Sequence, residues 1–297
     1  MTARTRSLWL LHGVVVIFGF TGILGKLITL DAEPLVFWRV SLGGISTALY
    51  LAWRREWRRW SPRDLAQAAA VGCIVAAHWV TFFAAIKVSS VGLALTMLAT
   101  APLFIGFIEP VVFRRKLVWR ELLVASAVFV GIATVFQAER DQVDGMVLGL
   151  SSAALAALFS TFNGVLVKRL EPVNLSAVEL LFASVAMLVW LACRGQAGPG
   201  LFVMSGEDWV WVAVLAVVAT SFAFVVSIQV LKNLTPFESA MAINLEPLYA
   251  IVLAWWIFGE RFSPGFYLGA AVVLGAVFLD SWWRARTQST ANSADAT

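Results

Sequence analysis

The sequence predicts an all-α integral membrane protein whose ten transmembrane helices form two inverted repeats of five helices, with both termini in the cytoplasm. Three observations lead to this fold class. Hydrophobic residues make up 60% of the 297 residues and charged residues only 13%, about half of what a soluble domain carries. Apolar stretches follow one another from Trp9 to Trp282 with short connections between them. The second half of the chain also repeats features of the first half at a constant offset.

Each apolar stretch is close to the length of about 20 residues that a helix needs to cross the hydrocarbon core. The expected spans are 8–28, 34–53, 65–86, 91–113, 121–138, 145–166, 176–193, 209–231, 236–258 and 264–282. Pro34, Pro236 and Pro264 stand at span starts, where the missing N–H group costs little. Pro102 and Pro247 instead lie inside the fourth and ninth spans, so we expect both helices to kink or unwind there.

The internal repeat is clearest at an offset of 145 residues. The matched positions are Lys87 with Lys232 (232 − 87 = 145), Pro102-Leu103 with Pro247-Leu248, Phe113 with Phe258, and Lys116 with Arg261. Because each copy holds an odd number of spans, the two copies should cross the membrane in opposite directions, a construction that secondary transporters use. We expect the first repeat at 1–143, the second at 144–284, and a disordered cytoplasmic tail at 285–297.

The basic residues set the expected orientation. All but six of the 22 Lys and Arg residues lie in alternate connections or at the termini, which the positive-inside rule assigns to the cytoplasm. The six others are Lys26, Arg39, Lys87, Arg140, Arg194 and Arg261. An odd number of spans would place Arg284 and Arg286 outside, against this rule. The pattern therefore predicts that both termini are cytoplasmic.

Composition and motifs exclude several functional classes. Ten spans consume nearly the whole chain, so no soluble catalytic or nucleotide-binding domain fits. The pI near 9.4 reflects the membrane charge pattern, and we expect no nucleic-acid partner. Cys73 and Cys193 have no metal-site or disulfide spacing. No H-E-x-x-H or G-x-S-x-G motif is present. The sequence therefore predicts a protein that is not an enzyme and has neither a metal nor a cofactor.

Short motifs in a fixed order carry a resemblance to a known family. The first half contains His78-Trp79-x-x-Phe82-Phe83-x-Ala85-Ile86-Lys87, then Ala94 and Pro102-Leu103-Phe104; the second half contains Glu246-Pro247-Leu248, Gly259-Glu260-Arg261 and Leu268-Gly269-Ala270. Over almost its whole length the sequence resembles the drug/metabolite transporter superfamily, specifically the EamA type with ten spans. One departure is Arg114-Arg115-Lys116 in place of Gly259-Glu260-Arg261, which the opposite facing of the two corners explains.

The resemblance implies a secondary transporter in the bacterial cytoplasmic (inner) membrane, most often an exporter of amino acids, metabolites or drugs. The substrate, the direction of transport and the coupling ion stay open. The expected partners are a small-molecule substrate, membrane lipid and, as a candidate coupling ion, protons; the default assembly is a monomer. The competing hypothesis is a non-transporting sensor or scaffold that keeps the fold.

Ionisable residues inside a span are expensive and usually face a partner or a water-filled cavity. Glu246 is the strongest candidate, because it lies at the centre of the ninth span, directly before Pro247. His78 could titrate or bind substrate, or it could form an interhelical hydrogen bond. Phe82 lies on the same helix face as His78. Trp79 could offer a stacking surface, although packing is its commoner use.

The remaining candidates have equally clear structural alternatives. Arg39 could bind an anionic group or could extend to the membrane interface beside Trp38. Thr96 and Thr100 share one helix face but could bond their own backbone. Asn163 and Asn244 could line a cavity or hold helices together. At the span ends, we expect Glu109 to be interfacial and Glu260 to pair with Arg261.

Overall fold

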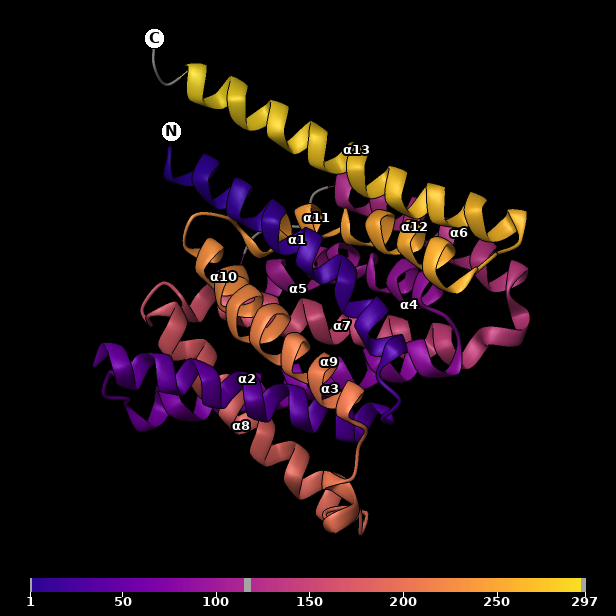
Figure 1. The fold of residues 1–297 in the computed structure, drawn as a ribbon. Coiled ribbons are helices and arrows are strands. Elements are labelled where there is room, and N and C mark those ends of the chain that lie inside the picture. Colours follow the sequence, from indigo (N-terminus) through magenta and orange to yellow (C-terminus); the bar gives the residue numbers. More distant parts are fainter. Residues whose placement is uncertain (1, 115–118, 295–297) are drawn as a thin grey trace.

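The structure is a computed structural model that describes residues 2–114 and 119–294. It is a bundle of α-helices (Figure 1). The elements of the first half are α1 (Ala3–Leu27), α2 (Ala32–Arg54), α3 (Pro62–Val88), α4 (Val91–Leu98), α5 (Ala101–Val112) and α6 (Trp119–Ala138). Those of the second half are η1 (Arg140–Gln142), α7 (Val143–Leu166), α8 (Pro172–Cys193), η2 (Pro199–Phe202), α9 (Gly206–Val214), η3 (Leu215–Phe222), α10 (Ala223–Gln229), η4 (Val230–Lys232), α11 (Pro236–Ile243), α12 (Glu246–Phe258) and α13 (Pro264–Ala294).

Within the described residues, 8 segments are long and apolar enough to cross a membrane. The fifth and tenth positions are filled by α6 and α13, whose apolar parts, Ser126–Ala138 and Pro264–Ala276, are shorter. The predicted all-helical membrane class is therefore confirmed. The third and seventh spans begin at Pro62 and Pro172, a few residues before the expected starts, because proline fits the first helical position without loss of a hydrogen bond.

The fourth and ninth spans are each broken into two helices. The first break lies at Ala99 and Thr100, between α4 and α5; the second lies at Asn244 and Leu245, between α11 and α12. Each proline occupies one of the first two positions of the helix after its break. The kinks expected from Pro102 and Pro247 are thus confirmed.

Helix packing follows a two-fold pattern in which equivalent helices of the two halves meet. The second helices, α2 and α8, pack together, and so do the fifth helices, α6 and α13 (Figure 1). Where α6 meets α13, a Cβ atom on Gly131 would lie 2.9 Å from the carbonyl oxygen of Gly269. A Cβ atom on Gly269 would lie 2.7 Å from the carbonyl oxygen of Gly131. Glycine is therefore required on both helices for this close approach.

The third span of the second half contains a stretch of π-helix that the sequence does not predict. Between α9 and α10, the segment η3 is a π-helix. Its Thr220 hydroxyl donates to the carbonyl of Leu215, five residues earlier, at 2.9 Å. π-Helical turns are rare and occur frequently at functional sites. This one packs against α2.

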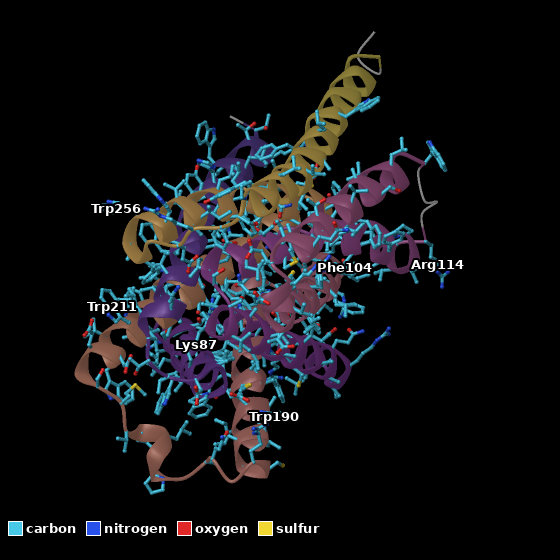
Figure 2. All side chains as sticks on the ribbon, turned by 90° about the vertical axis from the view of Figure 1, so that its right-hand side faces the viewer. Lys87, Phe104, Arg114, Trp190, Trp211 and Trp256 are labelled. Atoms are coloured by element: carbon cyan, nitrogen blue, oxygen red, sulfur yellow. The ribbon has the colours of Figure 1, made fainter. Side chains whose placement is uncertain are left out.

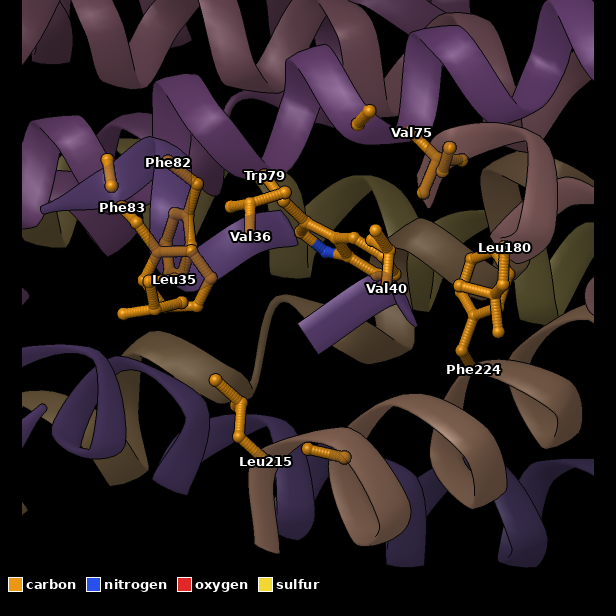
Figure 3. Packing of buried hydrophobic residues seen from close by; sticks show 14 of the residues in the cluster. Leu35, Val36, Val40, Val75, Trp79, Phe82, Phe83, Leu180, Leu215 and Phe224 are labelled. Carbon is orange, nitrogen blue, oxygen red and sulfur yellow. The ribbon is translucent and has the colours of Figure 1, made fainter. Parts of the chain in front are cut away.

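The main hydrophobic core lies where α2, α3, α8 and η3 meet, and Figure 3 shows its packing. Figure 3 shows Trp79 of α3 near the middle of this packing with Val40 of α2, while Phe83 of α3 and Phe224 of α10 lie to either side. Large apolar side chains also cover the outside of the bundle, for example Trp256, which is 75% exposed (Figure 2). A lipid-facing surface requires such side chains.

The start of α1 and the end of α13 lie on the same side of the molecule (Figure 1), as an even number of spans requires. Their cytoplasmic orientation stays a prediction. The backbone of α13 is helical to Ala294, residues 295–297 lie outside the described residues, and the disordered tail stays a prediction. Lys116, the expected match of Arg261, also lies outside the described residues.

Candidate functional site

A cavity of about 110 Å³ lies between the two halves, at the level of the two helix breaks. Both breaks contribute lining residues: Ala99 and Ala101 from the first, Asn244 and Glu246 from the second. Further lining residues come from the helices that flank the breaks, α4, α5, α11 and α12, and from α1, α2, α3, α7, α10 and η4. A cavity of about 150 Å³ is sufficient for a benzene molecule. At about 110 Å³ the cavity is somewhat smaller than that in this conformation, so its volume limits an enclosed ligand to a small molecule.

The two breaks meet through one hydrogen bond. The side-chain amide of Asn244 donates to the carbonyl of Ala99 at 2.8 Å, and these residues are equivalent positions of the repeat (244 − 99 = 145). That carbonyl is available because the N–H of Leu103 bonds to Thr100 instead, at 2.9 Å. Two equivalent positions can touch only where the pseudo-two-fold axis passes between them. Asn244 thus marks the axis, at the edge of the cavity.

Glu246 is the first residue of α12, and its side chain lines the cavity. It is 5% exposed. Among the residues that the structure describes, none forms a hydrogen bond or ion pair with its carboxylate. Its position at a helix N-terminus favours a negative charge. The equivalent position in the first half is Ala101, so the carboxylate is present in one copy only.

Arg39 lies opposite, on α2, and is 1% exposed. Its Nε donates to the Thr220 hydroxyl at 2.7 Å, which the π-helical turn of η3 presents. The guanidinium carbon is 4.0 Å from the ring centroid of Trp79 and 5.3 Å from that of Phe83. Its Nη1 has no hydrogen-bond partner within the described part of the chain. The alternative that Arg39 extends to the membrane interface is wrong, because the side chain is enclosed.

The aromatic candidates of α3 form one wall of the cavity. His78 lines it, and its Nδ1 lies 3.0 Å from the carbonyl and 2.9 Å from the hydroxyl of Ser152 on α7. The imidazole therefore also holds α3 against α7. Phe82 and Trp79 line the same cavity, and Phe159 of α7 packs 5.3 Å from the His78 ring centroid. Trp79 both packs in the core and supports Arg39.

Asn163 lines the cavity and leads to an acidic residue that the sequence analysis missed. Its amide nitrogen lies 3.2 Å from Oε2 of Glu179 on α8. Glu179 is fully buried, and neither its Oε1 nor Oδ1 of Asn163 has a hydrogen-bond partner in residues 2–114 and 119–294. One sequence feature could have identified this residue: Glu179 is the single charged residue of the expected span 176–193.

Two candidates are not brought to the cavity. The hydroxyl of Thr96 donates to the carbonyl of Gly92 at 2.8 Å, and that of Thr100 donates to the carbonyl of Met97 at 2.7 Å. Both side chains are fully buried and lie outside the cavity lining. Bonding to their own helix, the structural alternative, is what the geometry supports.

The two broken spans also touch at both of their ends, through carboxylates. At the predicted outer end, Glu260 pairs with Lys26 at 2.6 Å and accepts the N–H groups of Val91 and Gly92, each at 3.2 Å. Its expected partner, Arg261, is therefore the wrong one. Val91 and Gly92 are the first two residues of α4, so a residue of the second half caps a broken helix of the first.

At the predicted inner end the roles are exchanged. Glu109 of α5 accepts the N–H of Phe237, near the start of α11, at 3.1 Å. Phe237 is the equivalent of Gly92 in the repeat (237 − 92 = 145). Glu109 is 7% exposed, so it is buried between helices near the end of its span, and its location at the membrane interface stays a prediction. Each half thus caps the broken helix of the other.

The model of the EamA-like transporter family matches residues 5–137 and again 144–282. The chain belongs to the EamA-like transporter family. It is therefore a membrane transporter built from two EamA units, and members of this family are not enzymes. The two matches divide the chain between α6 and α7, where the sequence repeat also divides it.

Similar proteins support the assignment to this transporter family, and their names give no substrate. The chain is 25% identical over 270 residues to "Uncharacterized transporter YxxF" of Bacillus subtilis (strain 168), covering 88% of this chain and 84% of that protein. It is 25% identical over 301 residues to "Uncharacterized transporter YwfM" of the same organism, covering 93% and 94%. A solved structure described as "Crystal structure of protein" has a TM-score of 0.67 at 14% identity, covering 93% of this chain and 97% of that chain. It shows the shared fold alone.

Proposed function

We propose that this EamA-like protein is a secondary transporter that exports a small metabolite across the bacterial cytoplasmic membrane by alternating access. The observation that supports this proposal most directly is the cavity at the two helix breaks, lined by both halves. Transporters built from inverted repeats bind substrate near the midplane, between discontinuous helices. The volume of this cavity, about 110 Å³, favours a small metabolite over a drug-sized compound, which needs about 300 Å³ or more.

The contacts between the two broken spans suggest how access alternates. Glu260 joins them at the predicted outer end, Glu109 joins them at the predicted inner end, and Asn244 joins them on the axis between. In our proposal the spans rock about the Asn244 contact. Opening the outer end breaks the Glu260 contacts, and opening the inner end breaks the Glu109 contact.

Export against a gradient requires an energy source, and we propose protons. Glu246 is the candidate proton site, because its carboxylate lines the cavity and forms no hydrogen bond or ion pair with any residue that the structure describes. His78 is the weaker candidate, since Ser152 holds one of its two ring nitrogens. The replacement Glu246→Gln should abolish the dependence of flux on a pH gradient in proteoliposomes. A pH dependence that is unchanged in this variant would exclude Glu246 as the coupling site.

The decisive experiment is counterflow in proteoliposomes loaded with a defined mixture of amino acids, organic acids, nucleosides, vitamins and organic cations, followed by mass spectrometry. Protein-free vesicles are the control. We expect saturable, selective exchange of one class of compound. The alternative is a sensor or scaffold that keeps the fold without transport, and a complete lack of protein-dependent flux across the mixture would favour it.

A further inference from the structure

The connection between α2 and α3 has an excess of positive charge at the predicted inner end of the bundle. Residues 54–63, which we call the inner basic corner, contain the exposed arginines Arg54, Arg55, Arg58, Arg59 and Arg63. The two neighbouring acids are already engaged, because Glu56 pairs with Arg54 at 3.1 Å and Asp64 pairs with Arg169. Within the described residues, the other four arginines of the corner form no ion pair.

The connection is held in a fixed conformation by α8. The N–H of Arg58 donates to Oδ1 of Asn174 at 3.0 Å, and the side-chain amide of Asn174 donates to the carbonyl of Glu56 at 3.1 Å. Trp60, near the end of the connection, packs against the main hydrophobic core. The positive-inside rule requires only that basic residues lie on this side of the membrane. A fixed arrangement of arginines goes beyond that requirement.

The backbone at Arg55 has a conformation that favours glycine. Arg55 follows the end of α2 with a φ of 55°, and Gly195 follows the end of α8, its equivalent in the second half, with a φ of 69° (195 − 55 = 140). The ends of α5 and α12 repeat this pattern, with a φ of 52° at Arg114 and 65° at Gly259 (259 − 114 = 145). Within the described residues, every residue with a positive φ belongs to one of these two pairs.

In both pairs the glycine lies at the predicted outer end and the arginine at the predicted inner end. The left-handed conformation costs arginine free energy that glycine does not lose. The two halves thus share a backbone turn, and the inner copy carries a guanidinium despite this cost. A ligand that the guanidinium binds would offset the cost.

The corner also places cations at an unfavourable end of a helix. Arg63 is the second residue of α3, and Arg58 and Arg59 lie shortly before its start. The N-terminus of α8 lies alongside, because Asn174 in its first turn bonds to the connection. Helix N-termini carry partial positive charge, so they repel arginine and attract anions. A bound anion would therefore remove a repulsion that the protein itself leaves in place.

Two exposed tryptophans, Trp53 and Trp57, indicate the depth at which this anion lies. Tryptophan side chains are enriched at the level of the lipid headgroups, where the charged group of a phospholipid is a phosphodiester. Arginine can donate two parallel hydrogen bonds to a phosphate, and clusters of basic residues at the cytoplasmic end of a membrane helix attract anionic lipids. Free phosphate offers the same oxygens but has no apolar chain for the tryptophans.

We propose that the inner basic corner is a binding site for an anionic phospholipid, whose phosphodiester accepts hydrogen bonds from Arg55, Arg58 and Arg59. The site lies on the outside of the bundle, so it is independent of the proposed transport function. Its selectivity should be for the charge of the headgroup, since neutral phospholipids have a cationic group that the arginines repel.

The test uses the purified full-length protein in neutral detergent micelles. Native mass spectrometry measures the binding of palmitoyl-oleoyl phosphatidylglycerol and of palmitoyl-oleoyl phosphatidylcholine, which has the same acyl chains. We expect the anionic lipid to bind more tightly by about 10-fold or more. The double variant Arg58→Gln/Arg59→Gln should weaken its binding by about 10-fold to 100-fold. The control Arg194→Gln removes an exposed arginine that stacks on Trp190 at the predicted outer end, and it should leave the affinity unchanged.

Arg55→Gly separates a role in binding from a role in folding. Without lipid, this variant should raise the Tm by about 2–4 °C, because glycine adopts the left-handed conformation without cost. With phosphatidylglycerol, the further rise in Tm should be smaller than in the wild type, since a ligand stabilises the folded state according to its affinity. A purely structural arginine would give a lower Tm in both conditions.

Four outcomes would overturn the proposal. Equal affinity for the two lipids would show that headgroup charge is not recognised. Unchanged binding of phosphatidylglycerol by the Arg58→Gln/Arg59→Gln variant would place the lipid elsewhere. An equal loss in the Arg194→Gln control would show attraction by overall charge. A rise in Tm with inorganic phosphate alone that matches the rise with phosphatidylglycerol would show a site for a free anion in place of a lipid.

Discussion

The carboxylates at the two ends of the broken spans lead to a prediction with a defined direction. Glu260→Gln should increase opening at the predicted outer end, whereas Glu109→Gln should increase opening at the predicted inner end. Glutamine keeps the size and one acceptor oxygen of each side chain but removes its negative charge. At the outer end this removes the ion pair with Lys26 and weakens two bonds from backbone N–H groups.

The size of the effect follows from the geometry. Glu260 is nearly buried, with a side-chain exposure of 7%, while Lys26 is 34% exposed. A hydrogen bond to a charged group contributes about 1.5–3 kcal/mol, against about 1 kcal/mol for a neutral one. The exposed lysine and the long N–H contacts reduce this difference, so we expect a loss of about 1–3 kcal/mol in the closed state. That loss shifts the equilibrium between closed and open states by about 5-fold to 150-fold.

Cysteine labelling measures this shift directly. Cys73 and Cys193, both free and exposed, are first replaced by serine. The substitution Ser160→Cys then introduces a thiol into the cavity lining. A membrane-impermeant thiol reagent added outside should label it faster in the Glu260→Gln background and more slowly in the Glu109→Gln background. The two-ended mechanism would be refuted if the labelling rate changed in the same direction in both backgrounds, or if it changed in neither background.

Three further predictions concern stability, measured as the free energy of unfolding in detergent micelles with increasing denaturant. Asn244→Ala should cost about 1 kcal/mol, because the Ala99 carbonyl loses its donor; an unchanged value would show that the axis contact contributes nothing. Gly72→Ala should cost about 1–3 kcal/mol, since its Cβ would lie 2.3 Å from the carbonyl oxygen of Glu179. Gly106→Ala, which meets nothing within 4 Å, is its control and should cause no loss of stability, because alanine favours a helix interior over glycine. Glu179→Gln should change stability by less than about 1 kcal/mol, because a fully buried acid without a basic partner is expected to be uncharged; a larger loss would indicate a buried anion.

Hydropathy and the repeat were sufficient to predict the architecture. Membrane spans are read from composition because every backbone polar group must be bonded within the span, and the matched prolines predicted where two helices break. The charged and aromatic candidates Glu246, Arg39, His78 and Trp79 all line the cavity. For such residues the cost of burial in lipid is a strong signal that they face the interior.

The rest of the site depends on packing that sequence spacing does not encode. Thr96 and Thr100 share a helix face, but which way that face points is set by neighbouring helices, and it points away from the cavity. The π-helical turn that presents Thr220 to Arg39 has no sequence signature. The partners of Glu109 and Glu260 lie 128 and 234 residues away, so local spacing could only suggest nearby partners.

The differences between the two halves follow from the symmetry itself. On a two-fold axis, equivalent side chains occupy nearly the same space, so an amide that bonds the opposite backbone can be present in one copy only. Asn244 therefore requires a small residue at its equivalent, Ala99. The same reasoning applies to Glu246 and Ala101, because two carboxylates facing each other across the axis would repel in a low-dielectric cavity. A symmetric backbone thus favours an asymmetric site, and the substrate contacts are expected where the halves differ most.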